Sequence, residues 1–65
     1  MSITLKNLPI TGGSKIKLVN KRCIELWKGY MVDTLSEFLN KEVISLQPEL
    51  ESYNREILVI KLDIE

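Results

Sequence analysis

Few residues in this chain have side chains that could carry chemistry. The sequence contains no histidine, the commonest general base, and its one cysteine is Cys23. Without a histidine to activate it, this thiol is expected to be a small buried hydrophobe. One thiol and no imidazole cannot make a zinc site of ordinary composition. The sequence therefore predicts that the chain is not an enzyme and holds no metal or other cofactor.

Two short motifs resemble chemical sites, and both lack the spacing that the chemistry requires. The stretch ITGGSK is similar to the end of a phosphate-binding loop, but the G-x-x-x-x-G-K-[ST] spacing is missing and a strand is expected where a helix should follow. Glu49 and Glu51 share a loop with Tyr53, but no third ligand lies at a spacing typical of a metal site. We interpret the first motif as a flexible turn and the second as a solvated hairpin tip.

The charged residues are segregated along the chain, although the formal net charge is zero. Residues 1–31 contain six Lys and Arg residues and one Glu, whereas residues 32–65 contain eight Asp and Glu residues and three Lys and Arg residues. Neighbouring strands that pair opposite charges would explain this pattern. A basic hairpin that binds nucleic acid is the alternative, with Trp27 and Tyr30 available to stack on bases. The sequence pI of about 6.2 speaks against it. Its cationic residues would be Lys15, Lys17, Lys21, Arg22 and Lys28.

Hydrophobic periodicity predicts the elements that must position these residues. Alternation predicts strands at 2–6, 15–19, 22–28, 42–47 and 55–65, the fourth ended by Pro48 and followed by a loop over 48–54. Asn20 and Lys21 fit a hairpin turn, in which Asn tolerates a positive φ. A short helix is expected over 33–40, with Thr34 and Glu37 as a capping box and Asn40 as the left-handed residue after it. Its apolar stripe is Leu35, Phe38 and Leu39.

Residues 1–65 are therefore expected to form one α+β domain of the order β-β-β-α-β-β. Its mostly antiparallel sheet would have four to five strands, with the short helix packed on one face. The pattern does not decide whether the sheet stays open or closes into a barrel. The expected core face consists of Ile16, Leu18, Ile24, Leu26, Ile44, Leu46, Leu58, Ile60 and Leu62.

The opposite sheet face is expected to be apolar around Trp27, which is unusual for a wet face. An apolar patch on a small monomer usually marks an interaction site, and tryptophan is enriched at interface hot spots. The sequence thus predicts a surface that binds another protein or a second copy of the chain, as in a homodimer. The alternative is that the first strand and its loop cover this face and bury Trp27 as core. The predicted partner-binding residues are Trp27, Val19, Cys23, Tyr30, Val43, Ile57 and Val59.

Residues 26–49, LWKGYMVDTLSEFLNKEVISLQPE, resemble a pattern found in small uncharacterised proteins of bacteriophages and mobile elements of Gram-positive bacteria. The resemblance implies an accessory protein that acts by binding, for example an inhibitor of a host defence system. No segment approaches the ~20 apolar residues that span a bilayer, and the N-terminus lacks the apolar run of a signal peptide. We therefore expect a cytoplasmic protein that does not bind membranes. The leading hypothesis is a small non-enzymatic protein-binding domain, and the alternative is a nucleic-acid-binding module.

Overall fold

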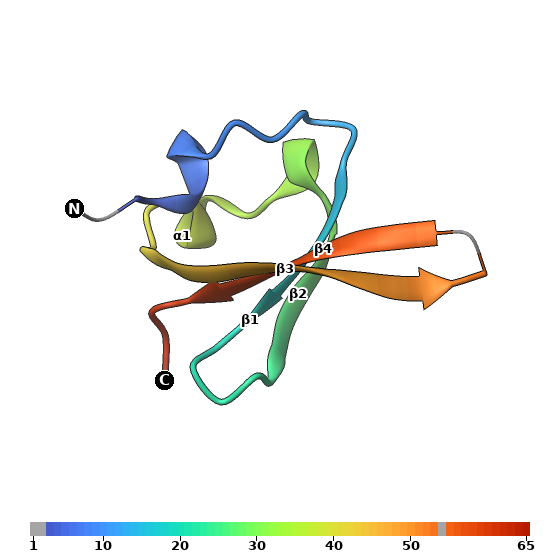
Figure 1. Ribbon diagram of the computed structural model, residues 1–65. Coiled ribbons are helices and arrows are strands. Elements are labelled where there is room, and N and C mark those ends of the chain that lie inside the picture. Colours follow the sequence, from blue (N-terminus) through green and yellow to red (C-terminus); the bar gives the residue numbers. More distant parts are fainter. Residues whose placement is uncertain (1–2, 54) are drawn as a thin grey trace.

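Within the described residues, four strands form a mixed sheet, with three short helical turns on one side of it (Figure 1). The structure is a computed structural model that describes residues 3–53 and 55–65. Strands β1 (Lys15–Val19) and β2 (Glu25–Tyr30) form one antiparallel hairpin, and β3 (Val43–Ser52) and β4 (Arg55–Leu62) form another. The strand order is β2-β1-β4-β3, because β1 and β4 pair in parallel at the centre. The α+β class is confirmed, whereas a mostly antiparallel sheet was the wrong expectation.

The helix expected over 33–40 is shorter than predicted, and the described residues contain three short helical turns. They are η1 (Leu5–Asn7), η2 (Met31–Asp33) and α1 (Ser36–Leu39). The hydroxyl of Thr34 donates to the carbonyl of Met31 at 2.7 Å and so closes η2, whereas Leu35 occupies the N-cap position of α1 without a side-chain cap. The capping box at Thr34 was therefore wrong. Asn40 has φ −93°, so it is not the left-handed residue expected after the helix.

The expected first strand is not part of the main sheet. Ser2 lies outside the described residues, and Thr4 forms an isolated bridge with Glu42 before η1 begins. The amide of Leu5 donates to the carbonyl of Lys41 at 3.0 Å, and the amide of Val43 donates to the carbonyl of Ile3 at 2.8 Å. These bonds hold the N-terminal segment against the start of β3. They also bring the side chain of Leu5 over the sheet.

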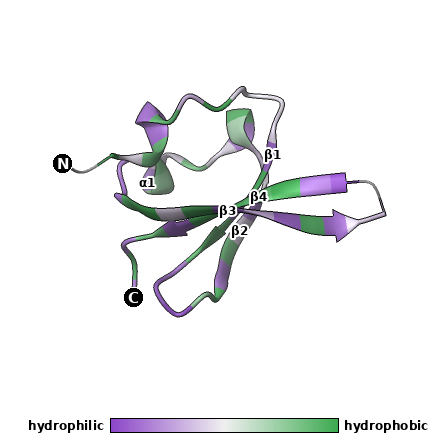
Figure 2. Ribbon diagram, viewed as in Figure 1, coloured by the Kyte–Doolittle hydropathy of each residue, from purple (hydrophilic) through white to green (hydrophobic). Residues whose placement is uncertain are grey.

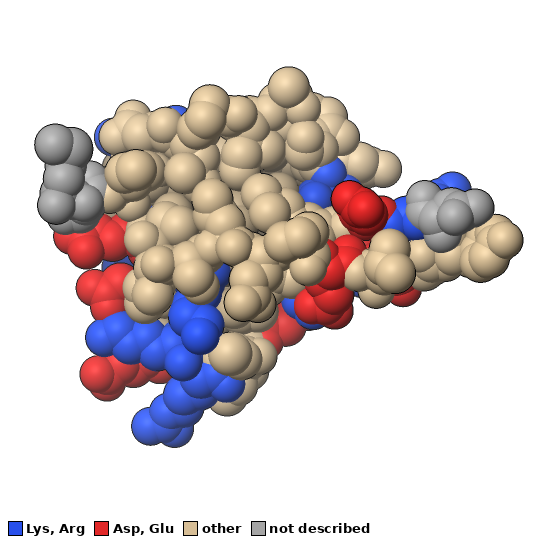
Figure 3. Space-filling model, viewed as in Figure 1, with Lys and Arg blue, Asp and Glu red and all other residues tan. Residues whose placement is uncertain are grey.

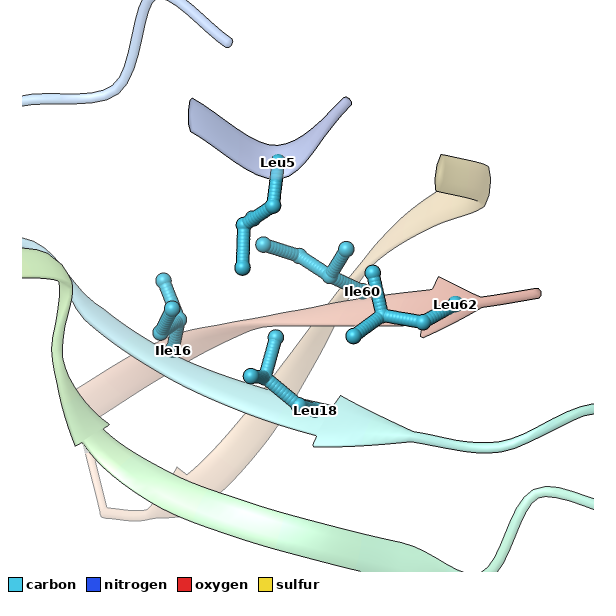
Figure 4. Close-up of a cluster of buried hydrophobic side chains, with 5 residues drawn as sticks. All are labelled: Leu5, Ile16, Leu18, Ile60 and Leu62. Atoms are coloured by element: carbon cyan, nitrogen blue, oxygen red, sulfur yellow. The ribbon is translucent and has the colours of Figure 1, made fainter. Parts of the chain in front are cut away.

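The central strands and Leu5 form the buried core (Figure 4). Its fully buried members are Leu5, Ile16, Leu18, Ile60 and Leu62. The prediction is confirmed for Ile16, Leu18, Ile60 and Leu62, because they alternate on the two central strands. It was wrong for Ile24, Ile44 and Leu46, which are 57%, 50% and 45% exposed. These three residues lie on the edge strands or next to them, where the short helical turns give less cover.

A bulge in β2 decides the position of Trp27. Leu18 pairs with Trp27 and Val19 pairs with Glu25, so Leu26 has no partner in the register. A bulge adds one residue and turns the side chains beyond it to the other face. Both Leu26 and Trp27 consequently pack, half-buried, against the core. The expectation that Trp27 lies on the face opposite the helix was wrong.

The second hairpin ends in a tip that projects beyond β1 (Figure 1), and we call residues 46–52 and 55–59, of which 58 and 59 still pair with β1, the arm. β3 continues through Pro48 to Ser52, so the predicted strand end and the predicted loop were wrong. Proline is tolerated here because β3 is an edge strand and the missing N–H leaves the pairing with β4 intact. In Figure 2, hydrophobic residues lie beneath the helical turns and continue along this arm.

Candidate binding surfaces

The sheet face opposite the helical turns is called the open face. The strand register places charged and apolar side chains from all four strands on it. Its members are Glu25, Lys28 and Tyr30 on β2, Lys15, Lys17 and Val19 on β1, Ile57, Val59 and Lys61 on β4, and Ser45, Gln47, Glu49 and, by its ion pairs, Glu51 on β3.

Ion pairs cross the open face from β3 to β1 and β2. Lys15 Nζ lies 2.6 Å from Glu51 Oε1, and Lys28 Nζ lies 3.3 Å from Glu51 Oε2. Lys17 Nζ lies 3.4 Å from Glu49 Oε1. Since β4 lies between β1 and β3, these side chains must extend over the apolar residues of β4. This cover explains why Ile57 is only 3% exposed on a face without a helix.

Glu51 is the centre of this network, because its two carboxylate oxygens face lysines from two different strands. The hydrogen bond from Lys15 lowers the pKa of Glu51 below its ordinary value, and Lys28 acts in the same direction while burial opposes both. Oε2 is buried and has no hydrogen-bond partner within the described residues. Its negative charge is offset by the 3.3 Å ion pair with Lys28.

A fourth ion pair fixes the β1–β2 turn to the chain end. Lys21 Nζ lies 2.8 Å from Asp63 Oδ1, and this hydrogen bond raises the pKa of Lys21. All four ion pairs join a lysine of residues 1–31 to an acid of residues 32–65. In Figure 3, Lys and Arg (blue) lie next to Asp and Glu (red) at the lower left of the view. Opposite charges from the two halves of the sequence are therefore paired, but not between neighbouring strands as one interpretation of the sequence expected: Lys15 and Lys17 reach across β4, and Lys28 reaches from one edge strand to the other.

The predicted nucleic-acid residues are divided by this pairing. Lys15, Lys17 and Lys28 lie together on the open face and are each paired with a glutamate, and Lys21 is paired with Asp63. Arg22 is exposed at the β1–β2 turn and has no ion pair within the described residues. Lys15 and Lys28 share the single charge of Glu51, so among the described residues three acids in all are paired with this set of five cationic residues.

The predicted protein-binding residues do not form one surface. Trp27 and Val43 pack half-buried against the core on the helix side, and Val43 pairs with Leu62 there. The other sheet residues of the set lie on the open face or at its edge. There, Val19 and Ile57 are 4% and 3% exposed, Val59 is half-buried and Tyr30 is 51% exposed.

Cys23 is exposed in the turn between β1 and β2, so the expectation of a buried thiol was wrong. It has φ 64°, the left-handed conformation that had been expected at Asn20. Asn20 is instead buried, and its Oδ1 accepts hydrogen bonds from the amides of Arg22 at 2.8 Å and Ile24 at 3.0 Å. These bonds close the turn, and the left-handed backbone of Cys23 reverses the chain direction within it.

An exposed apolar surface that the sequence reasoning missed lies on the helix side of the arm. Leu46, Pro48 and Leu50 pair with Ile60, Leu58 and Glu56, so they share the core side of the sheet. Leu46 and Leu50 are 45% and 70% exposed, and Tyr53 at the tip is 91% exposed. We call Leu46, Pro48, Leu50 and Tyr53 the arm surface. The alternation of Leu46, Pro48 and Leu50 carried this signal, but Pro48 was taken to end the strand.

A hollow of about 180 Å³ lies on the open face. Its lining residues are Lys17, Val19, Cys23, Ser45, Gln47, Glu49, Val59 and Lys61. Within residues 3–53 and 55–65, no group of three or more Cys, Asp or Glu side chains is arranged to hold a metal ion. Over the same residues, no helix has the length and apolar character needed to cross a membrane.

Comparisons with known proteins leave the family of this chain open. No family model matches the sequence, and no match is found among curated proteins or among solved structures. The resemblance to proteins of bacteriophages and mobile elements therefore stays a prediction.

Proposed function

We propose that this chain is a small non-enzymatic domain that binds another protein through the arm surface. The observation that carries the proposal is the exposed apolar row of β3 with Tyr53 in the turn after it: Leu50 is 70% and Tyr53 is 91% exposed. Leucine and tyrosine side chains on a projecting hairpin can enter a groove of a partner and become fully desolvated there. Contiguous apolar surface of this kind on a small domain usually marks a protein interface.

The edge of β3 favours docking by side chains over the addition of a strand. Pro48 has no N–H to offer to an incoming strand, and the register shifts near Ile44 and Glu51 interrupt the regular ladder. The first part of this edge is already occupied, because Ile3 and Leu5 hydrogen-bond to Val43 and Lys41. A partner would therefore contact mainly the side chains of the arm.

The proposed function can be tested with Leu50→Asp, which places a charge in the centre of the arm surface. Val32→Asp is the matched control, since Val32 is 73% exposed and lies in η2, outside the arm surface. Wild type and both variants would be immobilised, and the proteins retained from a lysate of the producing cells would be identified by mass spectrometry. Sedimentation over a range of concentrations would detect binding of a second copy.

We expect a partner that wild type and Val32→Asp retain and Leu50→Asp loses. The proposal would be contradicted if wild type and both variants retained the same proteins from the lysate. It would also be contradicted if no lysate protein were retained and sedimentation detected no self-association. Circular dichroism would verify that both variants remain folded. An accessory or inhibitory role, as the phage resemblance implies, would use such a surface and stays a prediction.

Nucleic-acid binding has less support as a function. The lysines that it requires on the open face are already paired with Glu49 and Glu51. The phosphates of a nucleic acid would have to displace these carboxylates from the lysines. Only then could the lysines neutralise the phosphates and release the counterions of the nucleic acid.

A further inference from the structure

We propose that the hollow on the open face binds a small monocarboxylate with a short apolar body. This inference is independent of the arm surface. It depends on the charge, the hydrogen-bonding groups and the size of the hollow, each of which limits the ligand in a different way.

The charge of the hollow favours an anion. Lys17 and Glu49 line it and offset each other through their 3.4 Å ion pair. Lys61 also lines it but makes no ion pair with any residue among 3–53 and 55–65, whereas Lys15, Lys17 and Lys28 are all paired on the same face. The positive charge of Lys61 is therefore uncompensated and available to a carboxylate.

Neutral hydrogen-bond donors lie next to this charge. Ser45 is the register partner of Lys61, and Gln47 is the register partner of Val59 on the same face. The serine hydroxyl and the glutamine amide can both donate to a carboxylate oxygen that is held by the ammonium group. A carboxylate with one cation and neutral donors around it makes charge-assisted hydrogen bonds, which are stronger than neutral ones.

The size and floor of the hollow limit the rest of the ligand. Val19 of β1 is the register partner of Lys61 of β4. Val19 and Val59 form the apolar part of the lining. The volume of about 180 Å³ is well below that of typical drug-sized sites, which begin near ~300 Å³. It is close to the ~150 Å³ of an apolar cavity that accepts benzene. A body of about four to six carbons therefore fits, by comparison with benzene.

The test is a titration of the isotope-labelled protein with butyrate at neutral pH and low salt, followed by amide chemical shifts. Butyramide and butylamine, the neutral and cationic molecules of similar size, are titrated in parallel. We expect saturable shifts at Ser45, Gln47, Val59 and Lys61 with butyrate, and at least ten-fold weaker binding with the other two compounds.

Lys61→Gln should weaken butyrate binding at least ten-fold. Lys41→Gln is the matched control, because Lys41 is exposed, lies outside the hollow and loses the same charge. Ser45→Ala provides a second variant that keeps every charge, and we expect about three-fold weaker binding. The proposal is overturned if butyramide binds as well as butyrate, if Lys61→Gln binds like wild type, or if no saturable shifts occur. Leu50→Asp should bind butyrate as wild type does. The test of the hollow is therefore independent of the test of the arm surface.

Discussion

The indole ring of Trp27 lies over Gly29, two residues further along β2. A Cβ atom on Gly29 would be 2.9 Å from both Cζ2 and Cη2 of Trp27, closer than such atoms approach in real structures. Residues two apart on a strand share a face, so the ring occupies the space of the missing side chain. Because Gly29 pairs with Ile16, the ring also lies beside the buried core.

Gly29→Ala should therefore displace the ring of Trp27. We expect a loss of about 1–3 kcal/mol in the free energy of unfolding, typical of overpacking, and greater quenching of tryptophan fluorescence by iodide. Urea unfolding and quenching measure the two effects. Gly13→Ala is the control, since a Cβ there meets no atom within 4 Å. Unchanged quenching in Gly29→Ala would show that the ring does not depend on this glycine.

Leu5→Ala should destabilise the chain strongly, although Leu5 lies outside the main sheet. Leu5 is fully buried and covers the central strands, so its truncation leaves a cavity that costs about 2–5 kcal/mol. Leu50→Ala makes the same chemical change at a side chain that is 70% exposed, and it should alter stability by no more than about 0.5 kcal/mol. Urea unfolding of both variants checks the contrast, and equal effects would mean that Leu5 is not part of the core.

The ion pairs of Glu51 should stabilise the fold above pH ~4.3, the ordinary pKa of glutamate. The folded-state pKa is lowered by Lys15 and Lys28, so the contribution is complete above the unfolded-state pKa and is lost as the pH falls through the folded-state pKa. Wild type should consequently be more stable than Glu51→Gln near neutral pH, and the difference should vanish in acid. Unfolding by urea from neutral to acidic pH measures this difference. A gap between wild type and Glu51→Gln that stays constant with pH would argue against the network.

Wild type should not be retained on heparin at ~0.15 M salt, where exposed charges are screened beyond ~8 Å. The double variant Glu49→Gln/Glu51→Gln frees Lys15, Lys17 and Lys28 from their carboxylates, so it should be retained and then released as the salt concentration rises. Elution profiles of the two proteins make the comparison. Strong retention of wild type that Lys17→Gln abolishes would instead support the nucleic-acid alternative.

The strands in the centre of the sheet could be predicted from the sequence, and the edge strands could be predicted only in part. Apolar residues alternate without interruption in the two central strands. The two-residue period of a strand therefore predicted correctly that these residues face the core: Ile16, Leu18, Ile60 and Leu62. Trp27 was placed on the wrong face because a single unpaired residue, Leu26, reverses the alternation, and no turn residue marks it. A bulge depends on tertiary pairing, and a one-residue slip moves every later side chain to the other face.

The candidate sites required information about which strands are neighbours. The segregation of charge along the sequence pointed to pairing between opposite charges, but the partners of Lys15 and Lys28 depend on β4 lying between β1 and β3. The hollow next to Lys61 depends on the same order, since its walls come from β1, β3 and β4. The sequence did not predict the arm surface, because proline usually ends a strand. Pro48 is tolerated here because β3 is an edge strand.

The parallel contact between β1 and β4 has a consequence for the kinetics of folding. It pairs Ile16 with Leu58 and Leu18 with Ile60, so each hairpin contributes only two of the five fully buried residues of the core cluster. An isolated two-stranded hairpin is marginal in water at best. The entropy of closing the long segment between β1 and β4 must therefore be lost before the core can form. Folding should depend on this late encounter of the two hairpins, and it should be slow for a chain of this length.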